Sequence, residues 1–202
     1  MEIYHEAGLD ISLGKWAAIL GTAADPPAAY EFLERHVGHS VDREALRARR
    51  ATREAELLAC ESPLPGVRDV LSEARERALR LAVASSSERS WVESHLVRFA
   101  LLEFFDVLVC ADDVERTKPA PDLYLGALRR LEVTAPEAIA FEDSAHGVEA
   151  AKLAGLFCVA VPNGVTRHAD LARADVVLPS LLARPLRLLI RDAESRAREA
   201  SD

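Results

Sequence analysis

The spacing of hydrophobic residues divides the chain into two parts. Residues 1 to about 60 carry apolar residues at helical intervals, and Asp42 can cap a long arginine- and alanine-rich helix. The segment Glu61-Ser-Pro-Leu-Pro-Gly66 then interrupts the pattern, because two prolines and a glycine cannot continue a helix. The sequence therefore predicts a helical domain, residues 1–61, joined by a stiff connector to a second domain, residues 62–202.

Helical and strand patterns alternate in the second domain. Apolar runs predict strands at 79–84, 106–110, 139–141, 157–161 and 176–178, and helical spacing predicts helices at 67–78, 88–99, 121–131 and 148–156. The last residues, 180–202, read as a helix with a polar end. This alternation predicts an α/β fold, with a parallel sheet covered by helices on both faces.

Composition narrows the class of protein. No apolar run approaches the roughly 18 residues of a membrane span, and a net charge of −8 argues against nonspecific nucleic-acid binding. Cys60, Cys110 and Cys158 are widely spaced and odd in number, which is typical of reduced thiols packed as small hydrophobic side chains. We therefore expect a cytoplasmic protein, a monomer or weak dimer, with neither a membrane nor a nucleic acid as partner.

A pair of carboxylates follows the apolar segment 139–141. Glu142 and Asp143 are adjacent, and they repel each other unless something positive lies close to both. A hard cation such as Mg²⁺, bound through carboxylate oxygens, would relieve that repulsion. The alternative is that Asp143 only caps the next helix and Glu142 is a solvated loop residue; taken alone, the pair supports both interpretations equally.

Two further polar groups follow strands of the same predicted sheet. Ser85, Ser86 and Ser87 stand between a strand and a helix, where hydroxyls and free N–H groups can bind phosphate, although serines there are also ordinary helix caps. Lys118 is held between Thr117 and Pro119, and a lysine fixed on a loop can neutralise a bound phosphate. Together with the carboxylate pair, these groups form a set suited to phosphoryl transfer, except that a nucleophile is missing.

These three segments resemble a known family. Val83-Ala-Ser-Ser-Ser87, Lys118-Pro-Ala-Pro-Asp122 and Phe141-Glu-Asp-Ser144 with Gly147 are similar to motifs two, three and four of the haloacid dehalogenase-like superfamily, subfamily IA, which holds β-phosphoglucomutase-like proteins and small-molecule phosphatases. The resemblance covers essentially the whole chain. It implies a Rossmann-like core with a helical cap, a small phosphorylated metabolite as substrate and Mg²⁺ as cofactor.

The resemblance also implies roles for individual residues. Ser85 would hydrogen-bond the transferring phosphoryl group, and Lys118 would bridge phosphate and nucleophile. Asp143 would bind Mg²⁺. Glu142 would be either a second ligand or an outer-shell residue that contacts the ligands and not the ion. Residues 1–61 would form the cap, in which the loop 21–25, including Thr22, and the basic residue Arg50 would contact substrate. Since that loop lacks an arginine for a second phosphate, a phosphatase is favoured over a phosphomutase.

The chain departs from the family at its first motif. An apolar strand ending in Asp-x-Asp-x-Thr/Val, whose first aspartate is the nucleophile, does not occur; Asp112-Asp113 has the wrong form, and His146, Asn163 and His168 are more simply loop or helix-end residues. By resemblance this strand is central, so its neighbours would lose ladder partners. We expect a misassigned translation start or a truncated form of a longer chain, and no phosphatase turnover by these residues alone.

Three functions therefore compete at this stage. The first is a Mg²⁺-dependent phosphatase or phosphomutase. The second is a non-catalytic relative that binds a phosphorylated metabolite or a protein through Ser85, Lys118 and Asp143. The third is a haloacid dehalogenase, which uses an aspartate nucleophile without a metal; the Glu142-Asp143 pair speaks for a metal and so for phosphoryl transfer.

Overall fold

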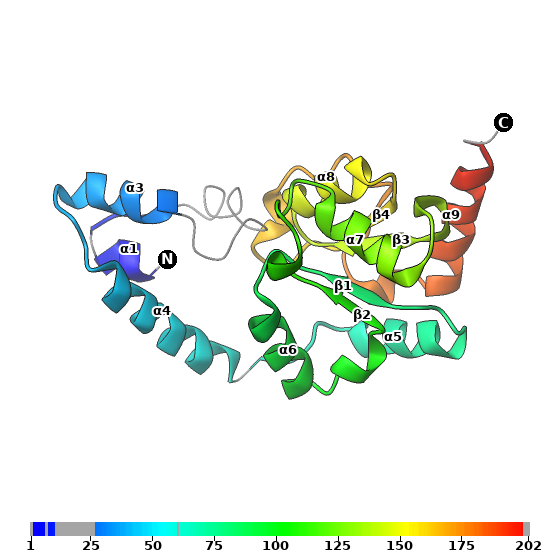
Figure 1. Cartoon of the computed structure of the whole chain (residues 1–202), viewed down its shortest axis with the longest axis horizontal. Helices are drawn as coiled ribbons and strands as arrows, with labels where there is room; N and C mark the ends of the chain where they lie inside the picture. The colour runs from blue at the N-terminus through cyan, green and yellow to red at the C-terminus, as the bar shows by residue number, and fades with distance from the viewer. Residues whose placement is uncertain (1, 7, 11–26, 60, 200–202) are drawn as a thin grey trace.

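The described residues of the N-terminal part are mainly helical, as the spacing predicts. The computed structural model describes residues 2–6, 8–10, 27–59 and 61–199. Its first helices are α1 (Glu2–Glu6), α3 (Pro27–Val37) and α4 (Arg43–Leu58), and they lie to one side of all the strands (Figure 1). The carboxylate of Asp42 accepts a hydrogen bond from the N–H of Ala45 at 3.0 Å, so it caps α4 as predicted.

The rest of the chain alternates helices and strands. The strands are β1 (Ala82–Ala84), β2 (Val107–Val109), β3 (Ile139–Glu142), β4 (Phe157–Ala160) and β5 (Val176–Val177); the helices are α5 (Val67–Glu76), α6 (Arg89–Arg98), α7 (Asp122–Leu131), α8 (Ala145–Leu153) and α9 (Leu186–Glu199). Short 3₁₀ helices span Leu102–Phe104, Ala111–Asp113, Ala135–Glu137, Thr166–His168 and Leu181–Ala183. The predicted α/β class is confirmed, with shorter strands than the apolar runs suggested.

One predicted helix begins at a different residue. α8 starts at Ala145 and not at Val148, because Ser144 is its N-cap and its hydroxyl accepts a hydrogen bond from the N–H of Gly147 at 3.1 Å. The cap brings the first turn of α8 directly behind Glu142 and Asp143. The carboxylate pair therefore stands at a strand-to-helix junction.

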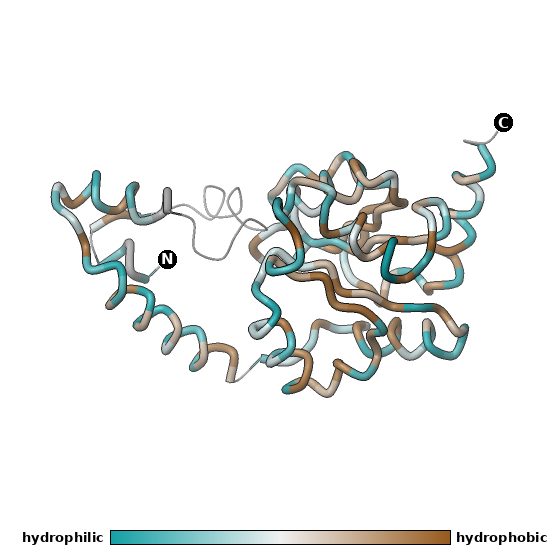
Figure 2. Tube along the Cα trace, viewed as in Figure 1, coloured by the Kyte–Doolittle hydropathy of each residue, from teal (hydrophilic) through white to brown (hydrophobic). Residues whose placement is uncertain are grey.

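All recorded strand pairs are parallel, and they form two separate groups. β1 pairs with β2, with Val83 opposite Leu108, while β4 lies between β3 and β5, with Ala140 opposite Cys158. β1 and β3 are not paired with each other. The strands carry the most hydrophobic stretches of the trace (Figure 2), as expected for strands covered on both faces.

Helix α7 holds the two strand groups together. Its Leu123 and Ala127 pack with Val109 of β2, and its Tyr124 and Leu128 pack in a second cluster with Ala140 of β3. On the far side of β4, Leu189 of α9 packs against Phe157 and Val159. The core is therefore continuous through α7 even though the strand ladder is not.

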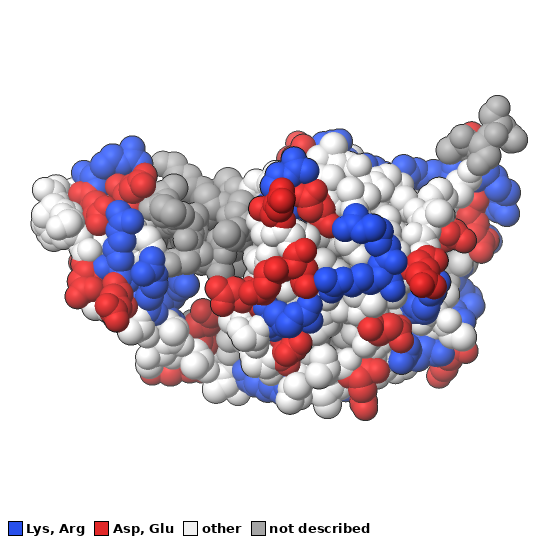
Figure 3. Space-filling view, in the orientation of Figure 1, with Lys and Arg blue, Asp and Glu red and all other residues white. Residues whose placement is uncertain are grey.

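The surface mixes both signs of charge. Figure 3 shows acidic and basic side chains interspersed over the face that it presents. Among the helices of the described residues, none combines the length and the apolar character that crossing a bilayer requires.

Candidate active site

The centre of the candidate site is the side chain of Glu142, at the end of β3. Glu142 is 7% exposed, and its Oε1 accepts hydrogen bonds from both Lys118 Nζ and the hydroxyl of Tyr124. The Lys118 and Glu142 side chains are 11% and 4% exposed, so their ion pair is largely removed from water. The sequence placed Lys118 and Glu142 near one another only through sheet topology; the structure joins them directly.

Tyr124 is the third member of this cluster. It lies in the first turn of α7, just after the proline-rich loop that carries Lys118, and the ammonium of Lys118 lies 5.1 Å from the centroid of its ring. Burial, followed by the negative charge of Glu142, raises the pKa of Tyr124 well above its usual value. Tyr124 therefore stays protonated and acts as a hydrogen-bond donor to Glu142.

The position of the other carboxylate oxygen of Glu142, Oε2, explains why residue 147 is a glycine. A Cβ at Gly147 would lie 1.8 Å from Glu142 Oε2 and 2.1 Å from its Cδ. Only a residue without a side chain lets the first turn of α8 approach the buried carboxylate this closely.

Asp143 faces outwards beside this cluster. Its side chain is exposed, and Oδ2 accepts a hydrogen bond from Asn163 Nδ2 at 2.9 Å. The surrounding protein and the neighbouring Glu142 carboxylate raise the pKa of Asp143, while Lys118 opposes them. Asn163 Oδ1 in turn accepts from the N–H groups of Val165 and Thr166, at 2.8 Å and 3.1 Å, which fixes the amide in place.

The residues fit a magnesium ion only in part. Among the described residues, no group of three or more His, Cys, Asp or Glu side chains is placed to enclose a metal. Mg²⁺, however, commonly takes one or two carboxylates and completes its shell with water and substrate phosphate. Asp143 meets that requirement, whereas Oε1 of Glu142 is already engaged by Lys118 and Tyr124.

The serine segment forms a turn after β1 and does not cap a helix. The N–H of Ser85 donates to the carbonyl of Val109 at 2.9 Å, and its hydroxyl accepts from the N–H of Ser87 at 3.1 Å. The N-cap of α6 is Glu88, so the interpretation of these serines as ordinary helix caps is excluded. Among the described residues, Ser86 Oγ is the buried side-chain polar atom without a hydrogen-bond partner.

Not every predicted site residue comes together. Ala84, the last residue of β1, packs against the cluster that contains Tyr124 and Ala140, which brings the serine turn to the same edge of the fold. No hydrogen bond within the described part of the chain joins Ser85 to Lys118 or Glu142. Arg50 lies exposed on α4, and Thr22 lies outside the described residues.

Asp113, which the sequence set aside as a nucleophile, has a structural role. Asp113 pairs with Arg89 at 2.7 Å and with Arg130 at 2.8 Å, which ties the loop after β2 to α6 and α7. Sequence reasoning set Asn163 aside and did not single out Tyr124. The Asn-Gly turn after β4 marked Asn163 only as a loop residue, and Tyr124 read as one more apolar position of α7.

Comparison with known proteins settles the family. The family model described as haloacid dehalogenase-like hydrolase matches residues 29–161. The chain belongs to this family. YhcW of Bacillus subtilis, named as a phosphatase, is 40% identical over 189 residues, which cover 94% of this chain and 86% of that protein. The resemblance drawn from three short segments is therefore confirmed, and so is the assignment to an enzyme family of hydrolases.

Other members of the family are similar over most of the chain. Validoxylamine A 7'-phosphate phosphatase of Streptomyces hygroscopicus subsp. limoneus is 37% identical over 158 residues, 76% of this chain and 73% of that protein. The crystal structure of CbbY from Rhodobacter sphaeroides in complex with phosphate superposes with a TM-score of 0.71 at 33% identity, covering 93% of this chain and 88% of that one. The α/β haloacid dehalogenase-like core is thus the fold of this chain.

Proposed function

We propose that this chain carries the phosphate- and cation-binding side of a Mg²⁺-dependent phosphatase that acts on a small phosphorylated metabolite. The observation that carries the proposal is the cluster of Lys118, Glu142 and Tyr124 beside the exposed Asp143, at the carboxyl ends of parallel strands. Related proteins with phosphatase names support the same reaction class. We also propose a cytoplasmic location.

Each residue of the site has a distinct role in this proposal. Asp143, oriented by Asn163, would bind Mg²⁺, which supplies positive charge against the phosphate oxygens when bound. Glu142 would hold Lys118, whose ammonium has further donors for a phosphate oxygen. The Ser85 hydroxyl accepts from Ser87 and keeps its own hydrogen to donate to the phosphoryl group.

The N-terminal helices would act as a cap that selects the substrate. We propose that residues 1–61 form this cap, that residues 62–202 form the core, and that Thr22 and Arg50 contact the substrate. The absence of an arginine from the loop 21–25 favours a phosphatase over a phosphomutase, which has to grip a second phosphate.

The nucleophile is the part that these residues do not provide. No Asp-x-Asp-x-Thr/Val sequence occurs among the 202 residues. Carboxylate nucleophilic catalysis requires that carboxylate, so positioning groups alone should give no measurable turnover. The same observation favours a second candidate, a non-catalytic protein that binds phosphorylated metabolites through Ser85, Lys118 and Asp143.

A Mg²⁺-dependent hydrolysis assay with an aryl phosphate tests these proposals. We would compare the 202-residue chain with a protein extended through any upstream in-frame codons, each with and without Mg²⁺. We expect activity in the extended protein only. Asp143→Asn should abolish that activity, whereas Asp69→Asn, on the exposed face of α5, should keep it. Activity of the short chain that Asp143→Asn abolishes would contradict our view of the nucleophile. If both proteins fold and neither hydrolyses the aryl phosphate, the non-catalytic phosphometabolite-binding protein would be favoured.

A further inference from the structure

The loop that follows β4 is tied directly to the candidate metal ligand. Asn163 donates from Nδ2 to Asp143 Oδ2 at 2.9 Å, and the N–H of Arg167 donates to the carbonyl of Asn163 at 3.0 Å. Arg167 is thus connected to Asp143 through a single intervening residue. We call residues 163–168 the Asn163 loop.

Thr166 anchors the Asn163 loop in the core. Its residue is 1% exposed, and its hydroxyl oxygen accepts a hydrogen bond from the N–H of Asn163 at 3.0 Å. The N–H of Ala169 donates to the carbonyl of Thr166 at 2.8 Å, and the buried Leu171 packs into the core cluster around β3 and β4. The short 3₁₀ helix of this loop is therefore fixed on both sides, and Arg167 is carried by a rigid support.

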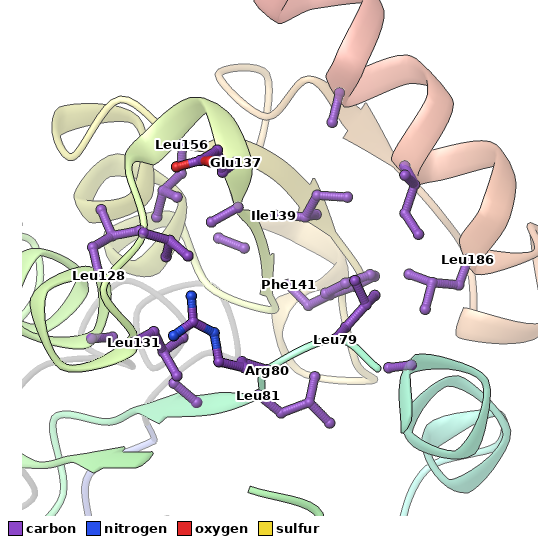
Figure 4. A pocket seen from close by; sticks show the side chains of 18 of the residues that line it. Leu79, Arg80, Leu81, Leu128, Leu131, Glu137, Ile139, Phe141, Leu156 and Leu186 are labelled. Carbon is purple, nitrogen blue, oxygen red and sulfur yellow. The ribbon is translucent and has the colours of Figure 1, made fainter. Parts of the chain in front are cut away.

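Arg167 is exposed, and within the described residues its guanidinium makes no hydrogen bond or ion pair. Other arginines of the core are already engaged. Arg80, at the edge of the cavity lined by residues of β1 and β3 (Figure 4), donates to the carbonyl of Glu132 at 3.4 Å. Arg196 donates to Asp175 at 3.1 Å. A guanidinium has five N–H donors, so Arg167 keeps its capacity for an anion from outside the protein.

The Asn163 loop lies at the same edge of the fold as the proposed phosphate site. Ser85 follows β1, Asp143 follows β3, and the loop follows β4, which pairs in parallel with β3. Arg167 therefore approaches this edge from the β4 side, whereas Ser85 and Lys118 approach it from the sides of β1 and α7. A substrate that spans the edge meets two separate cationic groups, Lys118 and Arg167.

We propose that Arg167 binds a second anionic group of the substrate, so that the preferred substrates are phosphorylated metabolites that also carry a carboxylate or a second phosphate. The planar guanidinium matches either group with two parallel hydrogen bonds. Glu142 and Asp143 would repel a second anion, and Lys118 is already paired with Glu142, so Arg167 supplies the charge that offsets this repulsion. The inference rests on the proposed function, because it places the first phosphate at Ser85 and Lys118.

Isothermal titration calorimetry with the 202-residue chain and Mg²⁺ compares three ligands that share a three-carbon skeleton. Glycerol 3-phosphate has one anionic group, 3-phosphoglycerate adds a carboxylate, and glycerol 1,3-bisphosphate adds a second phosphate. We expect at least one of the last two to bind about three- to tenfold more tightly than glycerol 3-phosphate, as expected for one charge-assisted contact at an exposed site. The ligand that gains affinity identifies the second anion.

Variants of exposed arginines assign this preference to one side chain. Arg167→Gln should remove the preference and leave the affinity for glycerol 3-phosphate unchanged, because the first phosphate does not contact Arg167. Arg167→Lys keeps the charge without the planar fork and should retain part of the preference. Arg191→Gln is the matched control, since Arg191 lies exposed on α9 and its guanidinium likewise has no partner in the described chain. This variant should keep the full preference.

The outcomes separate the role of Arg167 from the proposed function. A preference that survives in Arg167→Gln, or that Arg191→Gln removes equally, would overturn the role of Arg167. Equal affinity of the unaltered chain for all three ligands would overturn it as well. In that case, glycerol 3-phosphate binding that Ser85→Ala weakens would still support the proposed phosphate site. If no ligand binds a chain that circular dichroism shows to be folded, both the phosphate site and the role of Arg167 would be overturned.

Discussion

One carboxylate oxygen, Oε1 of Glu142, accepts hydrogen bonds from both Lys118 and Tyr124. A change in any of the three residues therefore alters the environment of the other two. A buried ion pair contributes little net free energy, because desolvation offsets its Coulomb attraction. Removing one partner is different, since it leaves an uncompensated buried charge. The site is therefore more sensitive to single substitutions than to replacement of the whole group.

The charge cluster gives a first prediction about stability. Lys118→Met should lower the free energy of unfolding by about 3–5 kcal/mol, because Glu142 stays buried without its cation. Lys118→Met/Glu142→Met should recover a large part of that loss, and adding Tyr124→Phe should recover more by removing an unpaired hydroxyl. Urea denaturation followed by circular dichroism measures the series. A double variant as unstable as the sum of its single variants would show that the three residues act independently.

The contact at Gly147 gives a second prediction. Gly147→Ala should destabilise the chain by about 1–3 kcal/mol, because Glu142 is held at its other oxygen and cannot swing away. Gly164→Ala is the matched control, since its Cβ would meet nothing within 4 Å, and its effect should stay within about 0.5 kcal/mol. Thermal unfolding of both variants checks this. Equal melting temperatures would mean that the first turn of α8 can move away from Glu142.

The elements around β2 are tied together by one carboxylate. Asp113, in the 3₁₀ helix after β2, accepts hydrogen bonds from Arg130 of α7, from the N–H of Cys110 and from Arg89 of α6. The bond from Arg130, followed by that from Cys110, lowers the pKa of Asp113 from 3.8 to about 2. This loop thus connects two helices that pack on the β1–β2 pair.

A third prediction follows for acid stability. Because the folded-state pKa is lowered, the contribution of Asp113 is present above pH 3.8 and is lost as the pH falls towards 2. The side chains of Arg89 and Arg130 are 36% and 45% exposed, so screening limits the contribution to about 1 kcal/mol. Asp113→Asn should be less stable than the unaltered chain at pH 7 and equally stable near pH 2, as urea titrations at each pH would show. A difference that persists at pH 2 would contradict this account.

Element types could be predicted from the sequence, whereas contacts between distant elements could not. Strand-to-helix alternation placed each strand of the second part, and Asp42 was a recognisable cap, whereas the cap of α8 is Ser144 and not Asp143. The roles of Tyr124 and Asn163 depend on tertiary partners 18 and 20 residues away, which no local pattern encodes. The division into domains at 61/62 and the assignment of Glu142 or Asp143 as metal ligands stay predictions.

At the scale of the whole molecule, the interrupted sheet is the dominant feature. α7 joins the two strand groups through its packing, yet within the described residues β1 and β3 share no ladder, and residues of both strands line one cavity. Open edges next to apolar surface promote pairing with other chains.

This arrangement gives a fourth prediction, about self-association. The apparent mass of the 202-residue chain in light scattering should rise with concentration, because the cavity lined by residues of β1 and β3 exposes strand edges and apolar side chains to other molecules. Phe141→Arg should move the onset of association to a several-fold higher concentration, whereas Val97→Arg, an equally charged change outside this cavity, should not. If Val97→Arg and not Phe141→Arg reduced association, the self-associating surface would lie on α6. A constant mass at all concentrations would mean that the edges of β1 and β3 are protected from other molecules.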